Sequence, residues 1–255
     1  MAHEEYRRIV PGAKTAVLFI HGIVGSPNHF LSRIPLVQKV PETWSVYNLL
    51  LPGHGAEMED IAQSSSGKWK NHVWRAFHEL SQNHEQVIVV GHSMGTLFSI
   101  QLAVDYPDKI PFLFLIAVPM IPYVWPQFAL TCLRLAFGKI RPDHPQEVAF
   151  TEATGTKTTR KLWKYATWIP RFWELFREIA VTAKLLPKLD VPTFAWQSNK
   201  DELVTRSSRK VLQRNDSIEI HELDNSTHFY YAPDERSRLL DEFRDLCDRY
   251  GKKQD

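Results

Sequence analysis

Short, continuous apolar runs recur along the chain and predict strands that are buried on both faces. These runs occupy residues 15–20, 45–49, 86–90, 112–118, 191–197 and 217–223, the last alternating enough to lie near an edge. Between them, segments such as 69–82 and 233–250 carry apolar residues at helical spacing. Helices are also expected over 27–40, with an interruption at Pro35, and over 204–213. Strands that alternate with helices predict an α/β fold, with a mostly parallel sheet flanked by helices on both faces.

Chemically suggestive residues follow several of the predicted strands. They are His21, Ser93, Pro119, Asp201 and His228. Parallel strands end at the same edge of a sheet, and ligands gather outside their carboxyl ends. We therefore expect these residues to converge on one edge.

The pentapeptide Gly91-His92-Ser93-Met94-Gly95 stands between the apolar run 86–90 and the helix-like stretch 96–105. A strand that breaks at G-x-S-x-G and restarts as a helix holds its serine on a strained turn with the hydroxyl exposed. The unpaired N–H groups at the start of that helix favour developing negative charge. The alternative is a glycine-rich turn that happens to contain a serine, but the strand-before, helix-after context favours Ser93 as a nucleophile.

A serine nucleophile needs a base, and histidine does this work best near neutral pH. Of the 11 histidines, His228 lies in the loop between the last predicted strand and the last helix, at the same sheet edge as Ser93. His54, in the loop Leu51-Pro52-Gly53-His54-Gly55, is the serious competitor. The order of the residues along the chain predicts His228 as the base.

The carboxylate that orients the base is expected between the serine and the histidine, after the preceding strand. Asp201 fits this position, and Glu202 and Asp224 are the alternatives. Asp201 could also cap the helix expected from Val204, so that both roles would require its two oxygens to divide the work.

Acyl transfer also needs hydrogen-bond donors for an oxyanion. The backbone N–H of Met94, directly after the serine, is one candidate, and that of Ile23 in the loop after the first core strand is the second. Gly22 and Gly25 would let this loop turn inward, although an ordinary tight turn is the alternative.

Composition excludes several classes of protein. A net charge of +2 over 255 residues, without a long Lys/Arg run, argues against a dedicated nucleic-acid-binding protein. Cys132 and Cys247 show no metal-ligand spacing and are expected to be reduced, structural thiols in a cytoplasmic protein. Neither a signal-peptide pattern at the N-terminus nor an apolar stretch of transmembrane length is visible.

The segment 119–188 differs from the remainder of the chain. It contains 11 Lys/Arg and 5 Asp/Glu, a net of +6, together with half of the eight tryptophans. Breaks at glycine and proline divide a mostly helical pattern. This shift in composition predicts an inserted subdomain.

With these motifs in this order, the chain resembles the α/β-hydrolases over nearly its full length. Its Leu51–Gly55 and Gly91–Gly95 motifs are similar to those of the carboxylesterase and monoacylglycerol lipase branch, also grouped with serine aminopeptidase-like hydrolases. The resemblance implies a hydrolase core of residues 1–118 and 189–255 and a helical cap of residues 119–188. One departure is Thr227 before His228, where a glycine is more usual.

The aromatic side chains of the cap allow three interpretations. The first is packing onto the core with the charges in water, the second is a pocket lining over the serine, and the third is contact with a membrane surface together with the interleaved cations. Trp125, Trp163 and Trp168 are the candidate substrate-binding residues.

The sequence therefore predicts a serine hydrolase that cleaves carboxylic esters of short to medium acyl chains through an acyl-enzyme on Ser93. No metal or organic cofactor is expected, and the expected partner is a small-molecule ester. Alternatives that use the same triad are a monoacylglycerol or lysophospholipid lipase, a thioesterase, an amidase and an acyltransferase. An alternative of another class is a hydrolase-fold receptor that binds a ligand with little or no turnover.

Overall fold

The computed structural model describes residues 3–251, so the outermost residues of the predicted core, 1–2 and 252–255, lie outside the description. A seven-stranded sheet forms the centre, in the order β1-β3-β2-β4-β5-β6-β7. The strands are β1 (Tyr6–Arg8), β2 (Thr15–Ile20), β3 (Ser45–Asn48), β4 (Gln86–His92), β5 (Leu113–Ile116), β6 (Thr193–Ser198) and β7 (Ile218–Leu223). All neighbours pair in parallel except β1, which pairs antiparallel with β3. The prediction of a mostly parallel sheet is confirmed, and β7 lies at an edge as expected.

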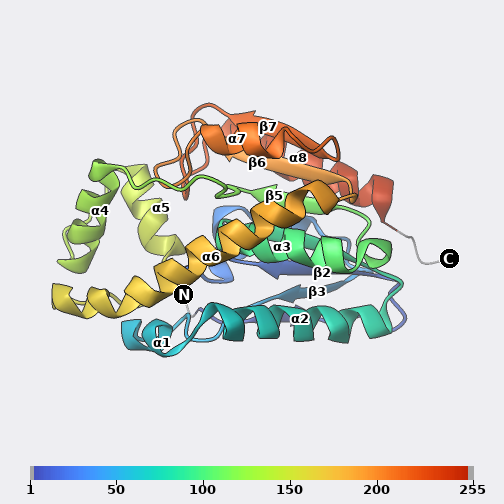
Figure 1. The fold of residues 1–255 in the computed structure, drawn as a ribbon, viewed down its shortest axis with the longest axis horizontal. Helices are drawn as coiled ribbons and strands as arrows, with labels where there is room; N and C mark the ends of the chain where they lie inside the picture. Colours follow the sequence, from blue (N-terminus) through green and yellow to red (C-terminus); the bar gives the residue numbers. More distant parts are fainter. Residues whose placement is uncertain (1–2, 252–255) are drawn as a thin grey trace.

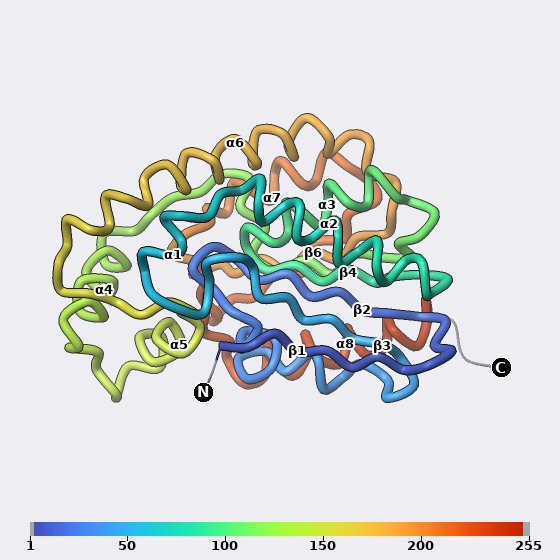
Figure 2. The backbone as a smooth tube through the Cα atoms, turned by 90° about the horizontal axis from the view of Figure 1, so that it is seen from below, coloured from blue at the N-terminus to red at the C-terminus, as the bar shows by residue number. Residues whose placement is uncertain are grey.

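Helices cover both faces of this sheet (Figures 1 and 2). They are α1 (Met58–Gln63), α2 (Ser66–Asn83), α3 (Met94–Asp105), α4 (Pro126–Ala136), α5 (Pro145–Ala153), α6 (Ile169–Leu185), α7 (Ser207–Leu212) and α8 (Pro233–Tyr250). Single turns of 3-10 helix occur at Leu36–Lys39, Pro107–Lys109 and Leu186–Lys188, with a longer one at Leu162–Trp168. Within the described residues, no helix is long and apolar enough to cross a membrane.

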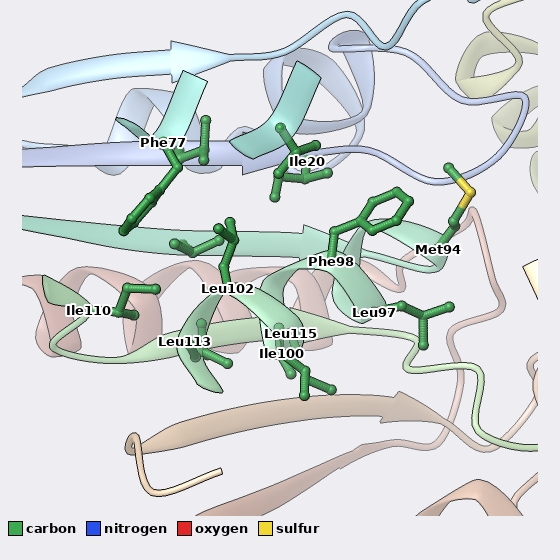
Figure 3. Packing of buried hydrophobic residues seen from close by; sticks show 14 of the residues in the cluster. Ile20, Phe77, Met94, Leu97, Phe98, Ile100, Leu102, Ile110, Leu113 and Leu115 are labelled. Atoms are coloured by element: carbon green, nitrogen blue, oxygen red, sulfur yellow. The ribbon is translucent and has the colours of Figure 1, made fainter. Parts of the chain in front are cut away.

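Two apolar clusters hold the layers together because successive side chains of a strand point to opposite faces. One joins the sheet to α2 and α3, and Figure 3 shows part of it, including Phe77 of α2, Phe98 of α3 and Leu115 of β5. The other joins the opposite face to α8, where the ring of Phe19 lies 6.3 Å from that of Phe243. The central strands β2, β4, β5 and β6 are buried throughout, as their continuous apolar runs predict.

The structure corrects several predicted elements. Instead of one helix over 27–40, a π-helical turn at His29–Arg33 is followed by extended Ile34 and a 3-10 turn, because Pro35 cannot continue the helix. The helix expected over 204–213 begins only at Ser207. The short β1 and α1 were not predicted, since neither has a strong apolar period. Of the two free thiols, Cys247 is buried in the core, whereas Cys132 is exposed on α4.

Between β5 and β6 the described chain forms α4, α5 and α6 and no strand. In Figure 1, α4 and α5 lie beyond one end of the sheet, and α6 crosses the outside of α3. The domain boundaries at 119 and 188 stay a prediction.

Candidate active site

Ser93 is the single residue between β4 and α3. Its backbone angles are φ 51° and ψ −122°, a strained conformation for a residue with a side chain. The turn is held on both sides, because the Ser93 N–H donates to the Ile116 carbonyl at 2.9 Å and the Ser93 carbonyl accepts from the Thr96 N–H at 2.9 Å. The fully buried strand and the helix behind it therefore fix the position of the serine.

Three glycines allow other parts of the chain to approach this turn. A Cβ atom on Gly95 would lie 2.0 Å from the Ile20 carbonyl oxygen, and one on Gly22 would lie 2.8 Å from the Cβ of Ser93. A Cβ atom on Gly91 would meet the α3 backbone at Thr96 at 2.8 Å. The pentapeptide thus needs its two glycines for close packing, while Ser93 itself adopts the strained conformation of the turn.

His228 and Asp201 form a buried pair at the same edge of the sheet. His228 Nδ1 donates to Asp201 Oδ2 at 2.9 Å, and the two side chains are only 2% and 1% exposed. Asp201 Oδ1 also accepts the backbone N–H groups of Leu203 and Val204, each at 2.8 Å. His228 Nδ1 also lies 3.1 Å from Oδ1, so Oδ2 contacts only the ring, whereas Oδ1 contacts the ring and also caps a turn that precedes α7.

Only one of the histidines at this edge has a raised pKa. Four others are buried there, namely His21, His29, His54 and His92. Burial lowers the pKa of His29 to about 3 and that of His54 to about 4, and it lowers those of His21 and His92 well below the ordinary value. Burial also acts on His228, but the carboxylates of Asp201 and then Glu202 outweigh it and raise its pKa. His228 is thus the histidine suited to accept a proton near neutral pH.

His54 and His21 shape the loop that faces the serine. His54 Nε2 accepts the Val24 N–H at 3.2 Å, while its Nδ1 donates to the Leu51 carbonyl at 3.2 Å. His21 Nε2 accepts the Leu51 N–H at 3.1 Å, and its Nδ1 donates to the Gly22 carbonyl at 2.8 Å. Because the ring nitrogens of both are engaged, the structure assigns these histidines to loop geometry rather than to proton transfer.

His92 connects the serine turn to the histidine loop. Its Nε2 donates to the His228 carbonyl at 3.2 Å, and its ring lies 4.9 Å from the His228 ring and 3.7 Å from that of His29. The loops that carry Ser93 and His228 are therefore adjacent. Among residues 3–251, Ser93 Oγ and His228 Nε2 have no hydrogen-bond partner, so both atoms are available for a substrate.

Two backbone N–H groups are available beside the serine. The N–H of Met94 begins α3, where it has no intrahelical acceptor. Ser93 Oγ lies 3.3 Å from the position of a Cβ on Gly22, which brings the loop containing Ile23 against the serine. In the described part of the chain neither the Met94 nor the Ile23 N–H has an acceptor.

Glu202 has a contact that the sequence did not indicate. Its Oε2 accepts the backbone N–H of His228 at 2.9 Å, and its own carbonyl accepts the N–H of Trp125 at 3.1 Å. Burial, and then the charge of Asp201, raise the pKa of this carboxyl. The sequence predicts Glu202 only as an alternative to Asp201 for the carboxylate that orients the base. Asp224, the other alternative, is exposed and bonds to Asn199.

A cavity of about 380 Å³ lies between α4, α5 and the loops of Asp201 and His228, but Ser93, Asp201 and His228 are not among the residues that line it. Its lining includes Trp125, Phe128 and Phe150 from the cap, with Glu202 and Thr227 from the loops. The other two candidate tryptophans lie elsewhere, since Trp163 is 72% exposed and the Trp168 indole donates to the Met58 carbonyl at 2.8 Å. Their role in substrate binding, like that of Trp125, stays a prediction. Within residues 3–251, no cluster of three His, Cys, Asp or Glu side chains could hold a metal ion.

Known proteins resemble the chain in sequence over limited stretches. It is 36% identical over 105 residues to a dihydrolipoyllysine-residue acetyltransferase component of an acetoin cleaving system from Cupriavidus necator, a match that covers 41% of this chain and 26% of the relative. It is 32% identical over 95 residues to a thermostable monoacylglycerol lipase from a Bacillus species, with 36% of each chain covered. A pimeloyl-[acyl-carrier protein] methyl ester esterase from Neisseria meningitidis is 30% identical over 181 residues, which cover 69% of this chain and 47% of that protein. The chain thus spans less than half the length of these relatives.

The fold extends the likeness to the whole chain. A solved structure of the metagenome-derived lipolytic enzymes LipS and LipT superimposes with a TM-score of 0.69 at 22% identity, covering 96% of this chain and 98% of the other. The family model described as the alpha/beta hydrolase family matches residues 17–242. This match includes Ser93, Asp201 and His228, and it shows that the chain belongs to the alpha/beta hydrolase family.

Proposed function

We propose that the chain hydrolyses carboxylic esters through an acyl-enzyme on Ser93. The observation that carries the proposal is the buried hydrogen bond from His228 Nδ1 to Asp201, at the sheet edge where Ser93 occupies its strained turn. A carboxylate on Nδ1 fixes the tautomer in which Nε2 is free to accept a proton. The raised pKa of His228 suits that role.

In the proposed reaction Ser93 Oγ attacks the ester carbonyl carbon, and its proton passes to His228 Nε2. The N–H groups of Met94 and Ile23 hold the oxyanion. When the tetrahedral intermediate collapses, the alcohol leaves with the proton from His228. Water activated by His228 then attacks the acyl-enzyme and releases the acid, which returns the serine to its starting state.

The proposed substrates are esters with short to medium acyl chains. Trp125, Phe128 and Phe150 give the nearby cavity an apolar wall suited to an acyl chain, although Ser93 is not among the residues that line it. Two relatives are named a monoacylglycerol lipase and a methyl ester esterase, which supports an ester as the bond that is cleaved.

A substrate panel tests this proposal. We expect the highest kcat/KM with p-nitrophenyl esters or monoacylglycerols and much lower values with thioesters and aminoacyl amides of the same acyl group. Ser93→Ala should abolish turnover of every substrate, whereas Ser237→Ala, on the exposed side of α8, should leave it unchanged. Turnover that survives in Ser93→Ala contradicts the proposal.

Product analysis separates hydrolysis from acyl transfer and from ligand binding without turnover. The free acid should be the product even when an alcohol is added, because water is the proposed acceptor. A product that is mainly the transferred ester indicates an acyltransferase. A ligand that binds to the wild-type protein and is never converted indicates a receptor.

A further inference from the structure

Helix α6 is attached to the core by one side only. On this inner side, Glu174 accepts the Ser66 N–H at 2.8 Å and Glu178 accepts from the side chain of Gln101 at 3.0 Å. Thr182 accepts a second bond from Gln101 at 3.0 Å, and Ile179 joins the apolar core. Both acidic side chains of α6 therefore face inward and have partners.

The outer side of α6 carries large apolar side chains in solvent. These residues, which we call the outer face of α6, are Ile169, Phe172, Trp173, Phe176 and Val181. The first four recur at intervals of three and four, so they form one stripe along the helix. Trp173 is 67% exposed. Figure 1 shows α6 crossing over α3, and Figure 2 shows it at the boundary of the molecule.

This concentration of exposed apolar side chains is confined to one part of the chain. Fourteen of the fifteen large exposed apolar side chains within residues 3–251 lie between Ile121 and Val181, and the other is Ile9. Scattered exposed apolar residues need no explanation, whereas a continuous stripe marks a surface that binds something.

The charged side chains around the stripe indicate which kind of surface it binds. Three cations are exposed here, Arg177 and Lys184 on α6 and Lys188 just beyond the helix. None of them has a carboxylate partner within residues 3–251. Because the acids of α6 face inward, the outer side presents apolar groups and positive charge only. A helix with a tryptophan-bearing apolar stripe and cations suits the interface of an anionic bilayer.

A second copy of the chain suits this face less well. A two-fold dimer places the same face of both molecules in contact. The interface would then contain Arg177 and Lys184 from both copies, with no acid on the outer side of α6 to neutralise them. Charge complementarity therefore favours an anionic surface over self-association.

We propose that the outer face of α6 docks the protein on the surface of anionic lipid membranes, with the helix lying in the plane of the interface. This inference does not depend on the proposed esterase activity. It can therefore be tested with Ser93→Ala protein, in which hydrolysis of the lipid does not enter.

Co-sedimentation with vesicles tests the proposal. Ser93→Ala protein should bind phosphatidylcholine vesicles that contain phosphatidylglycerol and bind pure phosphatidylcholine vesicles far more weakly. Adding Trp173→Ser and Phe176→Ser together should reduce binding about tenfold or more. Adding Arg177→Gln should reduce it about fivefold, and added salt should weaken it further.

Matched controls separate this face from nonspecific effects. Ile9→Ser removes the exposed apolar residue that directly follows β1, and it should leave binding unchanged. In Figure 2, β1 lies on the opposite side of the molecule from α6. Arg249→Gln, on the exposed side of α8, should do the same. Thermal unfolding of each variant shows whether it is folded, and Arg177→Gln tests the proposal even where an apolar variant does not fold.

Three results would overturn the proposal. The first is the absence of vesicle binding, or equal binding with and without phosphatidylglycerol. The second is binding that the α6 variants and the controls affect equally. The third is a concentration-dependent dimer, seen by analytical ultracentrifugation, that Trp173→Ser abolishes, since it would assign the face to a second copy.

Discussion

The side chains at the carboxyl edge of the sheet and those on the outer face of α6 differ in burial and in hydrogen bonding. At the sheet edge, His228 and Asp201 are buried and each has a defined partner. On α6, the acids turn inward to partners while Trp173 and Phe176 face solvent. Burial of the His228–Asp201 hydrogen bond fixes one geometry for the imidazole ring, which proton transfer needs. The exposed apolar side chains of α6 instead form a surface to which another surface, such as a membrane, can bind.

After the loss of Ser93 itself, the largest expected effect of a substitution comes from the buried pair. Asp201→Asn should reduce kcat/KM by about 10³–10⁴-fold, because an amide cannot hold His228 in the tautomer that accepts a proton on Nε2. The remaining amide oxygen can still accept from Leu203 and Val204, so the protein should stay folded. Ester hydrolysis and circular dichroism check the two parts of this prediction.

The control for this substitution is Asp224→Asn, which removes an exposed carboxylate close to His228 in sequence. It should leave kcat/KM within about twofold of the wild-type value. Equal losses in both variants would contradict the assignment of Asp201.

A second prediction compares the tolerance of the sheet edge and of the segment after α4 to one added methyl group. Gly95→Ala should lower the free energy of unfolding by about 3 kcal/mol, since its Cβ would lie 2.0 Å from the Ile20 carbonyl oxygen. Gly138→Ala, just after α4, meets nothing within 4 Å, and only its φ of +65° should cost about 1 kcal/mol. Denaturant unfolding measures both, and equal costs would contradict the contrast.

The smallest expected effect concerns Glu202. Neutral His228 is the proton acceptor, so kcat/KM should rise with pH through the pKa of His228. Glu202→Gln removes a negative charge that helps to raise this pKa, while its amide oxygen can still accept the His228 N–H. The acidic limb of the profile should therefore move to lower pH, with kcat at the optimum reduced by less than about tenfold.

The matched control is Glu219→Gln, an exposed carboxylate on β7, which should leave the pH profile in place. An acidic limb that moves to higher pH in Glu202→Gln, or that does not move, would show that Glu202 has no electrostatic effect on His228.

Much of the catalytic edge could be predicted from the sequence, because the constraints there are local. The continuous apolar run before Gly91 requires a buried strand, and two glycines around Ser93 allow the sharp turn. The loops of Asp201 and His228 follow from the rule that parallel strands end at one edge. The direction of the Glu202 side chain could not be predicted, because it depends on how its loop meets that of His228.

The cap was less predictable for a different reason. Helical spacing identifies which residues of α6 share a stripe, but not whether that stripe faces the core or solvent. The sequence suggested Trp163 and Trp168 as pocket residues, whereas the structure leaves Trp163 exposed and anchors Trp168 to the Met58 carbonyl. Packing partners far apart in sequence, such as Gln101 with Glu178, decide the orientation of the helix.

Labelling of the folded chain with a fluorophosphonate, followed by mass spectrometry, tests whether Ser93 is the nucleophile and His228 its base. We expect one adduct, on Ser93, which is absent in Ser93→Ala and forms orders of magnitude more slowly in His228→Ala. A folded protein in which Ser93 stays unlabelled, or in which His228→Ala labels at the wild-type rate, would contradict these two assignments.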